Sequence, residues 1–207
     1  MHFDPIGDEP RAGGGATGAV PHRTYPRVDA PWAPPGEYTV RLTVGNQQYT
    51  QPLSLRLDPR VQTPAAELAL LASLSREMYD GAIAANAAYE EARGRVAELD
   101  AAGGAEARAL KAEIEALAPA PRSGGGGRGG RGGGGGAAGP PNLQTVSQAM
   151  MSAAMSMQGA DVAPTMRQVA ACDEARAQFQ EVMRRWAALQ ASGRIMDTKP
   201  PTRSGHR

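Results

Sequence analysis

Residues 37–44 alternate between polar and apolar side chains, and this period of two is typical of a strand buried on one face. The apolar positions of this strand are Tyr38, Val40, Leu42 and Val44. Gly45 and Asn46 follow directly and suit a two-residue turn, because glycine accepts a positive φ at the first central position. The pattern therefore predicts a β-hairpin over residues 37–58.

The return strand of this hairpin is expected from about Gln48 to Leu57. Its apolar side chains share one parity, and they are Tyr49, Leu53, Leu55 and Leu57. Pro52 lacks an amide hydrogen, which indicates an edge position or a bulge. Because a single hairpin is only marginally stable in water, we expect its apolar face to be covered by the helices, by the preceding segment or by a partner.

Apolar residues at spacings of three and four predict two helices within residues 63–118. Thr63 is expected to cap the first helix, and Pro64 is expected to be its first helical residue. The long apolar stripe of this helix breaks at Gly103 and Gly104. A shorter amphipathic helix is expected to follow and to end at the next proline-rich segment.

Two more helices are expected within residues 142–192. Asn142 can cap the first of them, which should reach about Gln158. Pro164 is expected in the first turn of the second, whose stripe ends before Ser192. The fold class is therefore mainly α with a small β part. The economical arrangement is an antiparallel helical hairpin or bundle, preceded by the β-hairpin, with the two shorter helices packed together along the two long ones.

Three stretches are rich in glycine or proline and lack a periodic apolar pattern. Residues 1–36 predict an irregular lead-in, because prolines block both helices and sheet ladders. Residues 119–141 are expected to form a disordered loop rich in glycine and arginine, since little burial there opposes the entropy of the chain. Residues 193–207 are expected to form a disordered tail.

The charged side chains nearly cancel, with 22 Lys and Arg against 21 Asp and Glu. This balance argues against a field over the whole chain that would attract nucleic acid or an anionic membrane. Cys172 is the only cysteine, so neither an intramolecular disulfide nor a thiolate metal cluster can form. No apolar run approaches the roughly 18 residues that span a bilayer, and no export signal is recognisable. We expect no membrane partner.

No polar constellation in the sequence suggests catalysis. The neighbouring carboxylates Glu90-Glu91 and Asp173-Glu174 lie at different angles around their helices, unlike the facing pair that glycoside hydrolysis needs. His2, His22 and His206 lack metal-ligand spacing. Cys172 falls on a helical stripe, where packing is favoured over reactivity. We therefore expect no catalytic, cofactor-binding or metal-binding residue, and no cofactor.

Apolar side chains that need a cover suggest an interaction surface instead. The candidates are Tyr38, Val40, Leu42, Tyr49, Leu53, Leu55, Met150 and Met151. For the methionines, packing in the core is favoured over an adaptable face for a partner. The segment with Arg122, Arg128 and Arg131 offers RNA binding as an alternative, but no aromatic residues are interleaved with these arginines, so a plain loop is favoured.

Three motifs of the chain resemble one protein family. They are Pro-Pro-Gly-Glu-Tyr-Thr-Val-Arg-Leu-Thr-Val at 34–44, Tyr-Thr-Gln-Pro-Leu at 49–53 and Leu-Asp-Pro-Arg-Val at 57–61. These motifs resemble the C-terminal region of large bacterial sortilin-like propeller proteins with neuraminidase-type repeats, which are commonly described as glycosyl hydrolases. The resemblance implies that the hairpin is the end of an immunoglobulin-like sandwich and that a helical tail follows it.

The resemblance also implies preceding propeller domains as partners and a periplasmic or extracellular location. The Ser-x-Asp-x-Gly-x-Thr-Trp boxes of the family's propeller blades are absent, so no catalytic residue carries over. Our leading hypothesis is a non-catalytic structural or interaction module that binds propeller domains, another protein chain or a second copy of itself. The alternative is a part of a carbohydrate-active hydrolase whose propeller lies outside this sequence.

Overall fold

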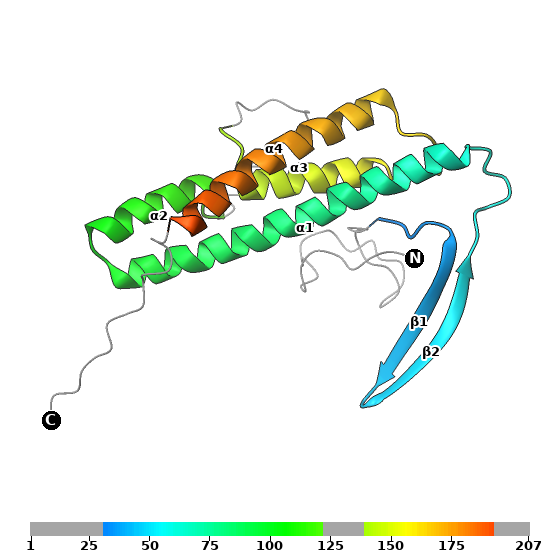
Figure 1. Ribbon diagram of the computed structural model, residues 1–207, viewed down its shortest axis with the longest axis horizontal. Coiled ribbons are helices and arrows are strands. Elements are labelled where there is room, and N and C mark those ends of the chain that lie inside the picture. The colour runs from blue at the N-terminus through cyan, green and yellow to red at the C-terminus, as the bar shows by residue number, and fades with distance from the viewer. Residues whose placement is uncertain (1–30, 122–138, 193–207) are drawn as a thin grey trace, which may run out of the picture.

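The computed structural model describes residues 31–121 and 139–192, in which one β-hairpin precedes a bundle of helices (Figure 1). The elements are β1 (Gly36–Val44), β2 (Gln47–Leu55), α1 (Ala65–Ala102), α2 (Ala105–Leu117), α3 (Leu143–Ser156) and α4 (Met166–Ala191). The prediction of a mainly α fold with a small antiparallel β part is therefore confirmed. The predicted tail and most of the predicted lead-in and Gly/Arg-rich loop lie outside the described residues.

The strands β1 and β2 pair antiparallel in the predicted register. Val44 lies opposite Gln47, so Gly45 and Asn46 form the two-residue turn, and Gly45 takes a φ of 59°. This positive φ is the conformation for which glycine is favoured in such turns. Pro52 lies within β2, which is an edge strand of the two-stranded sheet.

Helix α1 is the longest element, and the other helices pack along it. The chain turns back after α1 at Gly103 and Gly104, which have positive φ values of 67° and 95°. Helices α2 and α3 then lie one after the other along α1, and α4 covers α1 and α3 from a third side (Figure 1). The two shorter helices thus share one position in an antiparallel bundle, as predicted.

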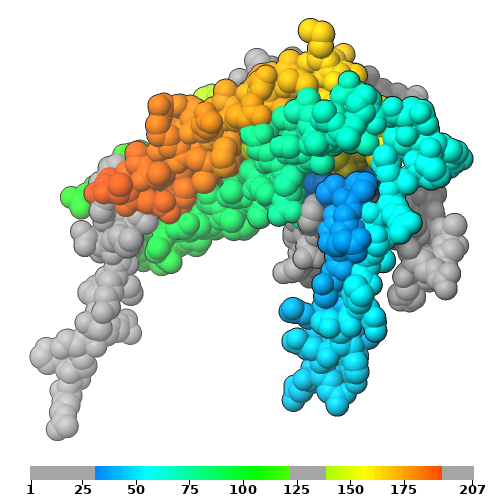
Figure 2. Space-filling view, turned by 45° about the vertical axis from the view of Figure 1, so that its right-hand side comes forward, coloured from blue at the N-terminus to red at the C-terminus, as the bar shows by residue number. Residues whose placement is uncertain are grey.

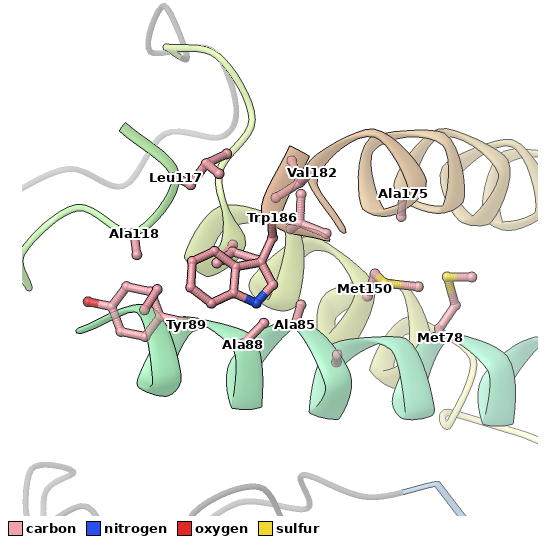
Figure 3. Packing of buried hydrophobic residues seen from close by; sticks show 14 of the residues in the cluster. Met78, Ala85, Ala88, Tyr89, Leu117, Ala118, Met150, Ala175, Val182 and Trp186 are labelled. Carbon is pink, nitrogen blue, oxygen red and sulfur yellow. The ribbon is translucent and has the colours of Figure 1, made fainter. Parts of the chain in front are cut away.

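Small side chains on α1 let the other helices approach it closely. Ala82, Ala85 and Ala92 are fully buried in the core. Figure 3 shows the large Trp186 ring of α4 lying over Ala85 and Ala88, in the space that these short side chains leave. Buried alanines therefore set the separation of the helices, and a few large residues fill the remaining volume.

The buried polar groups of the bundle are paired. The Ser147 hydroxyl of α3 donates a hydrogen bond of 2.9 Å to the carbonyl oxygen of Ala82. The Ser75 hydroxyl accepts a hydrogen bond from the side-chain amide of Gln158 at 3.0 Å. Among the described residues, no buried side-chain nitrogen or oxygen lacks a hydrogen-bond partner. Pairing avoids the free-energy cost of about 1–3 kcal/mol for an unsatisfied buried polar group.

Two predicted helix starts are wrong, and both involve a proline. Pro64 occupies the N-cap of α1, and the Thr63 hydroxyl does not cap the helix but donates to the carbonyl oxygen of Asp161 at 2.6 Å. Pro164 lies before α4, whose N-cap is Thr165 in a capping box with Gln168. In each case the predicted helix start falls one or two residues too early.

The predicted start of α3 is confirmed. The Asn142 side chain accepts a hydrogen bond from the Thr145 amide, and the Thr145 hydroxyl accepts one from the Asn142 amide, which completes a capping box. The helix ends at Ser156, slightly before the predicted end at Gln158. The side chain of Gln158 is instead available to bond Ser75 and the segment before β1.

An ion pair joins α4 to α1 on the surface of the bundle. The Arg176 guanidinium donates two hydrogen bonds to the Glu77 carboxylate, and a third reaches Asp173. The hydrogen bonds from Arg176 lower the pKa of Glu77, and partial burial of the carboxylate opposes this shift. The pair therefore stabilises the packing of α4 on α1 only while Glu77 is ionised.

Truncation of the buried Leu143 to alanine should lower the free energy of unfolding by about 2–5 kcal/mol, because it leaves a cavity in the core. Leu70→Ala is the matched control, since Leu70 is 47% exposed on α1. Urea denaturation followed by circular dichroism measures both variants. Equal losses in the two variants would contradict the described core.

Glu77→Gln should lower the free energy of unfolding at pH 7 by less than about 1 kcal/mol, because the ion pair is partly exposed. The folded-state pKa of Glu77 is lowered, so this stabilisation is present above the unfolded pKa of about 4.3 and is lost as the pH falls through the folded value. Urea denaturation at about pH 7 and pH 3 should show the difference between Glu77→Gln and the wild type shrinking at the lower pH. A difference that is the same at both pH values would contradict this account.

Candidate interaction site

The apolar face of the β-hairpin carries several of the large hydrophobic side chains that are exposed among the described residues. The hairpin projects away from the bundle, and its turn is the end farthest from the helices (Figures 1 and 2). Val40 is 42% exposed, Leu42 and Val44 are each 59% exposed, and Tyr49 is 55% exposed. Of the three covers expected from the sequence, namely the helices, the preceding segment or a partner, the helices therefore supply none over this part of the face.

The strand register brings the predicted hairpin candidates onto one face. Tyr38 lies opposite Leu53, and Leu42 lies opposite Tyr49. Residues opposite each other in a two-stranded sheet point to the same side, so these apolar side chains share one face, on which Gln47 and Gln51 are the polar residues. Val40 and Leu55 belong to the same face by their parity. Exposure increases from the half-buried Tyr38, Leu53 and Leu55 near the base to the exposed residues near the turn.

The hydroxyl groups of the two tyrosines on this face are bonded within the hairpin or next to it. Tyr38 donates to the carbonyl oxygen of Pro34 at 2.6 Å, and Tyr49 donates to the side-chain oxygen of Gln47 at 2.6 Å. These bonds hold the polar tips of the rings. The apolar rings are then available for contact with another surface.

Both ends of the hairpin are fastened to the turn between α3 and α4. Before β1, Pro31 is fully buried, and the Trp32 amide donates to the side-chain oxygen of Gln158 at 2.6 Å. After β2, the Thr63 hydroxyl donates to the carbonyl oxygen of Asp161 at 2.6 Å. The base of the hairpin is therefore anchored while its turn extends outward.

The two predicted methionine candidates do not belong to this surface. Met150 is 2% exposed, and Met151 is half-buried and packs against the core of the bundle. Figure 3 shows Met150 between the helices, close to Met78. A Cβ added at Gly81 would lie 2.3 Å from the terminal methyl group of Met150, so the methionine occupies the space that this glycine leaves. Of the two alternatives for the methionines, the structure thus shows core packing, the one that the sequence favours.

A shallow groove runs between α3 and α4, with a volume of about 650 Å³. Its lining is dominated by alanine, serine and glutamine side chains, with Arg167 and Glu174 as its charged residues. These two charged residues do not form the set of nucleophile, base and oriented donor that a hydrolytic site requires.

Most of the described side chains that were considered for catalysis are buried or are held by hydrogen bonds and ion pairs. Cys172 is buried, and burial raises the pKa of its thiol, so the thiol stays protonated near neutral pH. Glu91 accepts a hydrogen bond from Gln190, and Asp173 pairs with Arg176. His2, His22 and His206, like Arg122, Arg128 and Arg131, lie outside the described residues.

Residues 31–121 and 139–192 contain neither a candidate metal-binding cluster nor a candidate membrane-spanning helix. No group of three or more His, Cys, Asp or Glu residues within these ranges is arranged to hold a metal ion. No helix within them has the length and apolar character needed to cross a bilayer.

Comparison with protein-family models, with curated proteins and with solved structures yields no match to this chain. The proposed function below therefore rests on the exposed face of the hairpin. Its residues were accessible to sequence analysis through their alternation, whereas the anchoring residues Gln158 and Thr63 were missed. No local pattern marks a hydrogen bond between residues as far apart in sequence as Trp32 and Gln158.

Gln158→Ala should loosen the base of the hairpin, because it removes the acceptor of the Trp32 amide and the donor to Ser75. Amide hydrogen exchange at Trp32 should become about tenfold faster, as expected for the loss of about 1.4 kcal/mol. Gln190→Ala is the control, since it removes an exposed bond to Glu91 far from the hairpin. Unchanged exchange at Trp32 in the Gln158 variant would contradict the proposed anchor.

Proposed function

We propose that this chain is a non-catalytic interaction module, in which the helical bundle presents the apolar face of the β-hairpin to another protein surface. The observation that carries the proposal is the exposure of Leu42, Val44 and Tyr49 on a face that the helices leave uncovered. Large apolar side chains that are exposed side by side mark binding sites more often than isolated ones do. The anchored base supports the proposal, because an ordered hairpin loses less conformational entropy on binding than a loose one.

The apolar face is small, so its burial contributes only modestly to the free energy of binding. Full burial of a Val- or Leu-sized side chain contributes about 1.5–3 kcal/mol relative to full exposure. Val40, Leu42, Val44 and Tyr49 are each about half exposed, so completing their burial contributes about 1 kcal/mol per residue. The sum is a few kcal/mol, and the cost of association reduces it. The face therefore serves best as one part of a larger contact, such as that between domains of one protein.

The resemblance of the hairpin motifs to the C-terminal region of sortilin-like propeller proteins supports a specific partner. In that setting the partners would be preceding propeller domains and the remainder of an immunoglobulin-like sandwich, in an exported protein. Sequencing of the genomic region upstream of the first codon tests this part of the proposal. In-frame propeller repeats would support it, and an established translation start at Met1 would contradict it.

Leu42→Lys combined with Tyr49→Lys should strongly reduce the binding of a hydrophobic fluorescent dye to the purified chain, because both substitutions place a charge on the exposed face. Thr43→Lys is the matched control on the polar face, and its dye binding should equal that of the wild type. The helical circular-dichroism signal and its thermal midpoint should be unchanged in both variants. A wild-type chain that binds no dye would overturn the proposal.

A further inference from the structure

The geometry points to self-association through the outer edge of β1: two copies of this chain would pair antiparallel along β1 and form a four-stranded sheet about a twofold axis at Val40. This inference goes beyond the proposed function, because it uses the edge of the sheet and leaves the apolar face open for a different partner. Within the described residues, the sheet consists of β1 and β2 alone, so no described strand pairs with this edge.

The register shows which backbone groups point outward. The pair Val44 and Gln47 closes the two-residue turn and is therefore a hydrogen-bonded pair. Hydrogen-bonded and non-hydrogen-bonded pairs alternate along an antiparallel ladder. The residues of β1 whose amide and carbonyl groups face away from β2 are accordingly Glu37, Thr39, Arg41 and Thr43.

The two edges of the hairpin differ in their ability to accept another strand. On β2 the outward residues are Gln48, Thr50, Pro52 and Ser54. Pro52 has no amide hydrogen, so it interrupts any ladder in the middle of that edge. The outward residues of β1 include no proline, and all of them are exposed. The hairpin is thus protected against strand addition on one edge and open on the other.

The sequence of β1 is complementary to itself in the proposed register. A twofold axis at Val40 places Thr39 opposite Arg41 of the partner subunit and Glu37 opposite Thr43 of the partner subunit. Glu37 then lies diagonal to the partner subunit's Arg41, within reach of long side chains, and symmetry repeats this pair of opposite charges. Arg41 also lies diagonal to Arg41 of the partner subunit, so two attractive pairs outweigh one repulsive pair. On the other face, Tyr38 packs beside Leu42 of the partner subunit.

Shifted registers fit less well. An axis at Arg41 would place Arg41 opposite Arg41 of the partner subunit, and like charges directly opposite are unfavourable. An axis at Thr39 keeps the attraction between Glu37 and Arg41, but it aligns the end of β1 with Pro34 and Pro35, which lack amide donors. The axis at Val40 uses all nine residues of the strand, a length of about 30 Å. In this arrangement the two bundles lie at opposite ends of the sheet.

Exchange of the two charges tests the pairing. Sedimentation velocity at low salt should show the wild type dimerising, and Glu37→Arg or Arg41→Glu alone should weaken its dimer about tenfold, because each places like charges on the diagonal. An equimolar mixture of the two single variants should form a heterodimer as tightly as the wild-type dimer, and so should the double variant with itself. A wild-type chain that stays monomeric, or single variants that dimerise as well as the wild type, would overturn the inference.

A proline at an outward position tests the backbone pairing separately. Thr39→Pro removes an outward amide of β1, and Thr50→Pro is the matched control on the outer edge of β2; neither removes a hydrogen bond between β1 and β2. Thr39→Pro should be monomeric and Thr50→Pro dimeric. Equal association of the two variants would overturn the inference. Dye binding that persists in monomeric Thr39→Pro would show that the apolar face is independent of the dimer.

Discussion

Close packing of α1 against α2, α3 and α4 is the constraint on which the other features of the molecule depend. Alanines at the buried positions of α1, with Gly81, allow α3 and α4 to approach it. Met150 and Trp186 then fill the space that these small residues leave (Figure 3). Because α2 and α3 pack one after the other along α1, and α4 packs on α1 and α3, the bundle buries its apolar stripes without help from the hairpin. The core of the bundle therefore does not require the hairpin.

The hairpin, in contrast to the bundle, depends on contacts outside itself for its order. It contributes no strand residue to the core of the bundle, and two strands alone are marginally stable in water. Its order comes from local pairing, from the turn at Gly45, and from the hydrogen bonds of Trp32 and Thr63 to the turn between α3 and α4. The bundle thus holds at its end a small sheet. Among the described residues, the part of its apolar face near the turn and the outer edge of β1 have no cover. The proposed function rests on this division, in which the bundle is the support and the hairpin is the contact surface.

Much of this arrangement was accessible from the sequence, because periodicity reports burial directly. The period of two located both strands and the turn, and the period near 3.6 located all the described helices. The predicted cap of α1 fails because a local signal competes with a distant partner: Thr63 bonds Asp161 instead of capping the helix. The anchors of the hairpin depend on contacts between distant residues, which no local pattern encodes. The resemblance to propeller proteins rests on motifs alone and stays a prediction.

The accessibility of the tyrosines tests the central claim most directly, because they report on both parts of the molecule. Tyr49 is 55% exposed on the hairpin, whereas Tyr79 and Tyr89 of α1 are 4% and 6% exposed. Hydroxyl-radical footprinting of the full chain at low protein concentration, read out by mass spectrometry, should show rapid modification of Tyr49 and strong protection of Tyr79 and Tyr89. Protection of Tyr49 equal to that of Tyr89 would mean that the hairpin face is buried within the chain, and it would contradict the account.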